Sequence, residues 1–268
     1  MSAALPFFEA VANLKGKGLL PTSLGSAELR QIDSAIKRQS IFSARTTIES
    51  YLADIKRTVE SVINPQQVTR EGADQTVTEG FNPATARQEL RRQLAELGYQ
   101  PAEEDAGMIK DLSSDARIDL VVKTNTELAQ GAGAFIKQNS DPDGVDLYPA
   151  LELYRLEDKQ QPRNWEQRWR ICAQVVGEVD AARVLEETGR MVALKSSPIW
   201  QALGDGEDGS MDTLGNPYPP FAFNSGMWTE EIDRAEAEQL GLLDKGEAAE
   251  PAALDVASLF ATPTEEAA

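Results

Sequence analysis

Apolar residues recur at helical spacing along the first half of the chain. Ser26 is a suitable N-cap with Glu28 in the first turn, so a helix is predicted to begin there. The stretch 40–47 is rich in Ser and β-branched residues, which favours either two helices or one kinked helix. The apolar stripes on either side are Leu29, Ile32 and Ile36, and then Ile48, Tyr51 or Leu52, Ile55, Val59 and Val62.

Two more helices have clear start signals. Asn82 as N-cap and Pro83 at the first helical position open a helix that Gly98 ends. The next helix is predicted to open at Ser113 or Ser114. The inward positions of the two helices are Leu90, Leu94 and Leu97, and Ile118, Val121 or Val122, Leu128, Phe135 and Ile136.

The second half mixes strand and helix patterns. Alternation of apolar and polar residues predicts a strand at 148–156, and Trp165, Trp169 and Cys172 form one face of a helix. The other expected elements are a turn at 141–144, a helix at 179–187 closed by Gly189, a short strand at 191–194, a loop at 204–220 and a charged helix at 230–240.

Three segments lack a long periodic pattern. Residues 1–25 are predicted to form an apolar arm and a loop, and the arm is expected to pack on the body of the protein. Residues 65–81 are polar and predict a loop. Residues 244–268 are rich in Ala, Glu and Pro, which predicts a flexible acidic tail. Its one apolar cluster, around 254–260, is a candidate segment for folding on a partner.

These patterns predict a predominantly helical α+β fold. The expected regions are an N-terminal arm and helical region at 1–107, a smaller mixed α/β region at 108–228, and a charged helix with an acidic, disordered tail at 229–268. The segment 218–223 carries two prolines and three aromatic residues, and it is expected to fill the core of the second region. No internal repeat is visible.

The charge of the chain limits the kinds of partner that it is expected to bind. The net charge is −18, and residues 229–268 contribute 11 acidic and 2 basic side chains, so half of the excess lies in the last segment. A chain this acidic is a poor candidate for wrapping DNA or lying on an anionic membrane. No apolar stretch is long enough to span a bilayer, and the N-terminus lacks a signal-peptide pattern, so a cytoplasmic protein is expected.

Two absences in the sequence limit its chemistry. The chain has no histidine, which excludes Ser-His-Asp and Cys-His nucleophiles and histidine metal sites. Cys172 is the only cysteine and is expected to be a buried structural thiol. No pair of carboxylates is distinguishable as a general acid and base, so no catalytic, cofactor or metal residue is assigned.

Three short motifs have weak functional interpretations. Gly131-Ala132-Gly133 does not follow a predicted strand, so close helix packing is preferred to a nucleotide site. The acidic loops at 141–144 and 205–209 lack EF-hand spacing. Arginines interleave with Trp165 and Trp169, as in a surface that stacks single strands. A core stripe covered by arginine stems is preferred, and nucleic-acid contact is the disfavoured alternative.

Four blocks, in this order, resemble the phage minor head proteins, the head-morphogenesis family related to the F protein of phage Mu. The blocks together cover about residues 41–227. They are Phe42-Ser43-Ala44-Arg45-Thr46-Thr47; the helix from Asp115-Ala116-Arg117 through Asn125 to Gly133; Glu152 to Asp158 with Pro162-Arg163 and Trp165 to Trp169; and Pro198-Ile199-Trp200 with Tyr218-Pro219-Pro220-Phe221 to Met227. The family's histidine after the third block and its closing cysteines are absent here, so a metal or catalytic role does not carry over.

The resemblance implies a minor structural component of a phage or prophage head, acting near the portal in the virion head and in the host cytoplasm during assembly. The implied partners are portal and major capsid proteins, without membrane contact, and self-association stays open. No cofactor and no enzymatic activity are expected. The motif positions expected to be structural or partner-binding are Arg45, Asn125, Arg155, Trp200, Pro219, Pro220 and Asn224.

Two alternatives remain at this point. The first is an assembly scaffold or portal chaperone that leaves before maturation, which suits an acidic chain with a flexible tail. The second is a nuclease or ADP-ribosyl-transfer enzyme, since head proteins of this kind are sometimes joined to toxin domains. The missing histidine and the missing acid/base pair argue against the second alternative.

Overall fold

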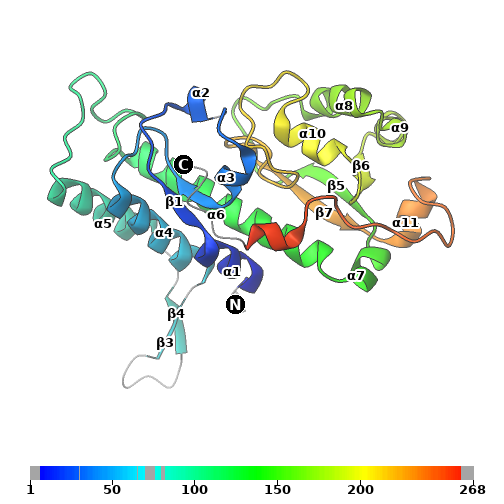
Figure 1. The fold of residues 1–268 in the computed structure, drawn as a ribbon, viewed down its shortest axis with the longest axis horizontal. Coiled ribbons are helices and arrows are strands. Elements are labelled where there is room, and N and C mark those ends of the chain that lie inside the picture. Colours follow the sequence, from blue (N-terminus) through cyan, green and yellow to red (C-terminus); the bar gives the residue numbers. More distant parts are fainter. Residues whose placement is uncertain (1–6, 30, 65, 70–75, 80–81, 261–268) are drawn as a thin grey trace. The chain divides into compact units, whose positions relative to one another are not determined.

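The computed structural model describes residues 7–29, 31–64, 66–69, 76–79 and 82–260 (Figure 1). About 49% of the protein is helical and 11% is strand, with small sheets, which confirms the predicted helical α+β class. Two compact units divide the chain. Unit 1 comprises the described parts of 1–29, 39–133 and 260–268, and unit 2 those of 30–38 and 134–259. The division falls after Gly133, inside a helix, rather than at the region boundaries expected from the sequence.

Unit 1 is mainly helical, with two pairs of short strands. Strands β1 and β2 are parallel, and β3 and β4 are antiparallel. The elements of this unit are α1 (Phe8–Gly16), β1 (Gly18–Leu20), α2 (Ser26–Leu29), β2 (Ser40–Phe42), α4 (Glu49–Ile63), β3 (Gln66–Thr69), β4 (Thr76–Glu79), α5 (Pro83–Glu96) and the first part of α6 (Asp115–Asn139).

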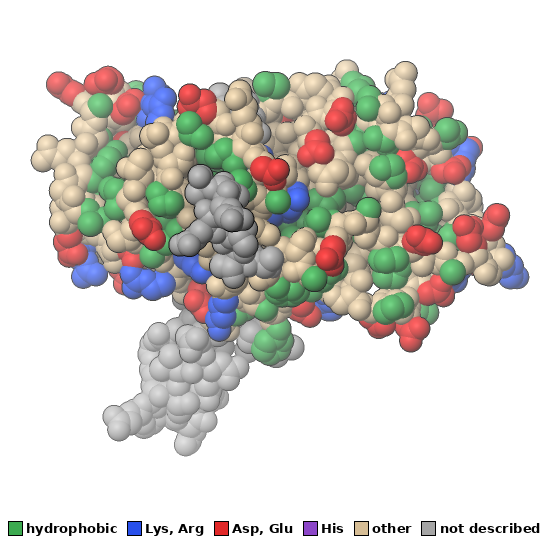
Figure 2. All heavy atoms as spheres, viewed as in Figure 1, with side chains coloured by type: hydrophobic (Ala, Val, Ile, Leu, Met, Phe, Trp, Pro, Cys, Tyr) green, Lys and Arg blue, Asp and Glu red, His purple; other side chains and the backbone are tan. Residues whose placement is uncertain are grey.

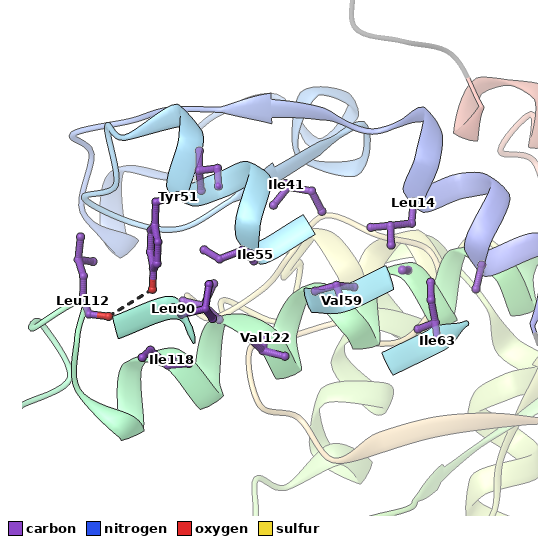
Figure 3. Close-up of a cluster of buried hydrophobic side chains, with 14 of the residues drawn as sticks. Leu14, Ile41, Tyr51, Ile55, Val59, Ile63, Leu90, Leu112, Ile118 and Val122 are labelled. Atoms are coloured by element: carbon purple, nitrogen blue, oxygen red, sulfur yellow. Dashed lines mark hydrogen bonds between the residues drawn. The ribbon is translucent and has the colours of Figure 1, made fainter. Parts of the chain in front are cut away.

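The core of unit 1 consists mostly of aliphatic side chains from four helices. Helix α4 packs against α1, α5 and both strands β1 and β2. Figure 3 shows side chains of α4 directed toward those of α5 and α6, with the Tyr51 hydroxyl donating to the Leu112 carbonyl oxygen at 3.3 Å. The buried residues drawn there include Leu14, Ile55, Val59, Leu90, Ile118 and Val122. The arm residues Val11 and Leu14 belong to this core, as predicted.

The sequence predictions for helices α4, α5 and α6 are confirmed, including Asn82 as N-cap: its Oδ1 accepts from the backbone amide of Ala84 at 3.0 Å. Gly133 allows the close packing expected of its motif, because an added Cβ would lie 2.5 Å from the backbone nitrogen of Ala10.

Other predictions for the first half are wrong. The helix expected from Ser26 breaks into α2 and α3, residues 40–42 form β2, and 66–69 and 76–79 form a strand pair instead of a loop. Leu97 is exposed rather than inward.

Unit 2 is built on a three-stranded antiparallel sheet with the strand order β6-β5-β7 (Figure 1). Alternate residues of the central strand face opposite sides: Leu151 and Leu153 pack with α8 and α10, and Ala150 packs with Val184 and Ile232. The elements are α3 (Ser34–Arg38), α7 (Pro142–Leu147), β5 (Ala150–Arg155), α8 (Trp165–Val176), α9 (Val179–Thr188), β6 (Met191–Leu194), α10 (Ile199–Asp205), β7 (Met227–Ile232), α11 (Arg234–Gln239) and a 3-10 turn at Val256–Leu259.

The second half also differs from its predictions at several points. The charged helix expected at 230–240 is a strand, β7, followed by the short helix α11, because residues 227–232 pair along β5. The expected turn at 141–144 opens helix α7, and α10 was not predicted.

The predicted tail is partly anchored. The backbone amide of Ala252 donates to Asn139 Oδ1 at 2.9 Å, and Leu259 is buried. The rest of the tail, 261–268, lies outside the described residues.

Acidic side chains are spread over the face shown in Figure 2, with fewer Lys and Arg side chains among them. This distribution agrees with the net charge of −18. Among the described residues, no helix combines the length and the apolar character needed to cross a membrane.

Candidate functional site

The four sequence blocks meet in two pairs, one pair in each unit. The first block pair joins residues 42–47 to the helix α6 in unit 1. The second block pair joins residues 152–169 to residues 198–200 and 218–227 in unit 2. The motif positions are therefore divided: Arg45 and Asn125 belong to the first pair, and Arg155, Trp200, Pro219, Pro220 and Asn224 to the second.

In the first block pair, two side chains of α6 hold the backbone that follows β2. The amide of Asn125 donates to the Phe42 carbonyl oxygen at 3.3 Å and to the Val121 carbonyl oxygen at 2.9 Å. About two turns earlier on the helix, Arg117 Nη2 donates to Ser43 Oγ at 2.7 Å and to the Ala44 carbonyl oxygen at 2.5 Å. The segment 42–44 is thus fixed along α6 by two buried polar side chains.

Arg45 follows this fixed segment and has an unusual backbone conformation. Its φ is +58°, in the left-handed region that favours glycine, and its amide donates to the Leu24 carbonyl oxygen at 2.9 Å. Its side chain is exposed and has no ion pair with a described residue. The motif arginine therefore marks a tight turn rather than a buried contact.

Arg117 is a buried cation that has no carboxylate partner in the part of the chain that the structure describes. The side chain is only 9% exposed, and its Nε has no hydrogen-bond partner within the described residues. Burial lowers the pKa of Arg117, and the neighbouring charge of Arg45 lowers that pKa further. Burial also raises the pKa of Tyr51, which lies close to this guanidinium. The motif analysis did not single out Arg117, although it belongs to the second sequence block.

The second block pair is held together by backbone pairing and by long basic side chains. Strand β5 pairs with β7, with Arg155 opposite Met227. Arg163 Nη2 donates to the Phe223 carbonyl oxygen at 2.7 Å, and its Nη1 donates to the Asn224 carbonyl oxygen at 3.1 Å. Asn224 also has a positive φ, of +51°, and its Oδ1 accepts from Lys159 Nζ at 2.8 Å.

Aromatic side chains fill the space behind this contact. Trp200 meets Trp169 edge to face at 5.2 Å between ring centroids and stacks on Phe221 at 6.1 Å. The indole N–H of Trp200 donates to the Leu194 carbonyl oxygen at 2.8 Å. Pro219 and Pro220 are buried and joined by a cis peptide bond. The segment 218–223 is thus part of the core of unit 2, as predicted.

A group of donors at the start of α8, which we call the Trp165 corner, was not found from the sequence. It consists of Arg155, Trp165 and Arg168. Arg155 Nη2 and the backbone amide of Trp165 donate to the same acceptor, the Arg163 carbonyl oxygen, at 3.2 and 3.1 Å. The guanidinium of Arg168 lies 4.9 Å from the centroid of the Trp165 ring. Both Trp165 and Trp169 are buried, as the core interpretation of the Arg/Trp stretch expects.

The remaining predicted group is Cys172, which is buried in α8. Burial raises the pKa of its thiol to about 12. In the part of the chain that the structure describes, no three Cys, Asp or Glu side chains are grouped to hold a metal ion. Comparison with known proteins adds no further assignment, since no protein family, no curated protein and no solved structure matches the chain.

Proposed function

We propose that this chain is a minor structural component of a phage or prophage head, which acts by protein–protein contact near the portal. The observation that carries the proposal is the pairing of the four blocks. The blocks that resemble the head-morphogenesis family are far apart in the sequence, yet Asn125 donates to the Phe42 carbonyl oxygen across the first block pair, and Trp200 packs edge to face on Trp169 across the second.

The chemistry of the motif positions favours a structural role for them. Asn125 and Trp200 use their side-chain donors on backbone carbonyl oxygens, and Pro219 and Pro220 are buried. These side chains hold loops and fill the core, so partner contact falls to exposed residues. Exposed apolar side chains of unit 2 are available for it: Leu147, Tyr148, Val175 and Val179.

Quantitative mass spectrometry of purified heads, from the phage or prophage that encodes the chain, tests the proposal. We expect a few to tens of copies per mature particle, scored against the portal and major capsid proteins. Presence in immature particles alone would replace the proposal with an assembly scaffold. Absence from both kinds of particle would refute a structural role.

A second experiment asks which surface makes the contact. Val179 is 75% exposed, so Val179→Glu is expected to leave the melting temperature unchanged and to reduce incorporation into heads. The matched control, Glu178→Gln, alters the preceding residue without adding a charge to an apolar position. Equal incorporation of both variants would exclude this surface.

A further inference from the structure

The three buried tryptophans of unit 2 differ in one respect. The indole N–H of Trp169 donates to the Ala181 carbonyl oxygen at 3.1 Å, and that of Trp200 donates to the Leu194 carbonyl oxygen at 2.8 Å. Trp165 is 3% exposed, and its N–H has no hydrogen-bond partner within the described residues. Since buried N–H groups are almost always paired, the Trp165 N–H points to an acceptor that the described residues do not supply.

Two further donors of the Trp165 corner share this property. Nη1 of Arg155 and Nη1 of Arg168 are both buried without a partner among the described residues. They lie close to Trp165: Arg168 stacks on its ring, and Arg155 donates to the same carbonyl oxygen as its backbone amide. All three unpaired atoms are donors, so each of them requires the same kind of group, a hydrogen-bond acceptor.

The charges of the corner indicate the kind of acceptor. Arg163 and Arg168 form ion pairs with Asp212, at 2.5 and 3.0 Å, and Arg168 also lies 3.6 Å from Asp208. Arg155 forms no ion pair with a described residue, although the chain has 44 acidic side chains. Within the set formed by Arg155, these two arginines and the two aspartates, three guanidinium groups exceed the carboxylates by one positive charge. Helix α8 begins at Trp165, so its N-terminus adds positive potential at the same place.

We infer that the Trp165 corner binds a small monovalent anion, with chloride as the occupant under cellular and laboratory conditions. Trp165 Nε1 and Arg168 Nη1 donate to the ion, and Arg155 supplies both a donor and the balancing charge. A small ion suits the corner because these donor atoms are closed off from bulk solvent. A trapped water molecule would satisfy donors but would leave the positive charge unbalanced.

The test measures the melting temperature of the full chain in sodium chloride and in sodium gluconate, whose anion is much larger than chloride. At equal ionic strength, a ligand that binds only the folded state raises its stability as its concentration rises. With gluconate replaced by chloride at constant total salt, we expect the melting temperature to rise by about 3 °C between about 10 and about 200 mM chloride.

Two variants assign the effect to the corner. Trp165→Phe removes the donor and keeps a ring, so the response to chloride should be lost. Trp200→Phe is the matched control: it removes an indole N–H that already has a partner, so its response to chloride should be retained. The same response in both variants, or no difference between chloride and gluconate in the unaltered chain, would overturn the proposal in favour of trapped water.

A further measurement uses the unaltered chain, so its result does not depend on whether a variant folds. Crystals grown in sodium bromide should show an anomalous peak beside the indole nitrogen of Trp165. A data set without a peak at that position contradicts the anion site, whatever the variants show.

Discussion

The cores of the two units are built from different side chains. Unit 1 buries mainly Leu, Ile and Val from the helices α1, α4, α5 and α6, with Tyr51 as the aromatic residue among the fully buried members of the cluster. Unit 2 buries Trp165, Trp169, Trp200 and Phe221 between a small sheet, two helices and the irregular segment 218–223. The core of unit 1 consists mostly of aliphatic side chains on regular helices, whereas the core of unit 2 adds four large rings to aliphatic and small side chains on varied backbone.

This difference predicts how much stability each unit loses when one buried side chain is truncated. An aliphatic core divides its buried area among many side chains, so one truncation removes a modest share. An aromatic core concentrates area in a few rings, and each ring contacts others at 5.2 to 6.4 Å between centroids. Loss of one ring in unit 2 should therefore cost more than loss of one aliphatic side chain in unit 1.

The largest expected effect is that of Trp169→Ala. The side chain is 0% exposed, contacts Trp200 edge to face and donates to the Ala181 carbonyl oxygen. We expect a loss of about 4 kcal/mol in the free energy of unfolding of unit 2. Urea unfolding followed by circular dichroism measures it, with Val179→Ala at an exposed position as the control. A loss of unfolding free energy smaller than that of Ile55→Ala in unit 1 would refute the comparison.

The corresponding change in unit 1 is Ile55→Ala, at the centre of the cluster in Figure 3. We expect a loss of about 3 kcal/mol, and of about 1 kcal/mol for Ile55→Val, because the smaller change leaves a smaller cavity. The same urea experiment provides both values. Equal losses for the two variants would mean that the site collapses around the missing atoms and that the aliphatic core is plastic.

The sequence predicts elements that depend on local patterns better than elements that depend on distant partners. Helices α4, α5 and α6 were predicted because their buried residues recur at the helical period, which is a local property. Strand β7 was missed because Glu230 and Glu231 favour a helix locally, and only the pairing with β5 makes them extended. Strand β2 was missed for the same reason, since its partner β1 lies some twenty residues earlier.

The sequence predicted part of the candidate site. Resemblance singled out Arg155 and Asn224, and both lie in the second block pair. It could not indicate that Trp165 differs from Trp169 and Trp200, because the sequence assigns Trp165 and Trp169 to one apolar helix face and Trp200 to a motif, without showing which indole N–H has a partner. Whether an indole N–H finds a carbonyl oxygen depends on the fold, so this signal exists only in three dimensions.

The third prediction concerns the pH dependence of stability that the thiol of Cys172 gives to unit 2. Its thiol has an ordinary pKa of 9.0, and burial raises that pKa to about 12 in the folded protein. Between these values the folded state binds the proton and the unfolded state does not, so stability falls as the pH rises. From pH 8 to pH 10 the thiol should contribute a loss of about 1.4 kcal/mol.

The measurement is urea unfolding at pH 8, 9 and 10 for the unaltered chain and for Cys172→Ala. The variant should lose less stability over this range, because it lacks the thiol. Parallel pH profiles for the two proteins would show that the thiol is not protonated preferentially in the folded state. Burial raises the pKa of Tyr51 as well, so unit 1 should begin to weaken only above pH 10, where the unfolded tyrosine ionises.

The smallest expected effect compares the two residues other than glycine with positive φ in the described chain, one in each unit. Arg45 has an exposed side chain without an ion pair, so Arg45→Gly removes the left-handed penalty and should stabilise unit 1 by about 0.5 kcal/mol. Asn224 tolerates this conformation, and its Oδ1 accepts from Lys159 Nζ, so Asn224→Gly should destabilise unit 2 by about 0.5 kcal/mol. The opposite signs in urea unfolding are the decisive result. If both changes stabilise, the Lys159 contact contributes nothing and Asn224 is strained like Arg45; if both destabilise, the Arg45 side chain stabilises the fold in spite of its exposure.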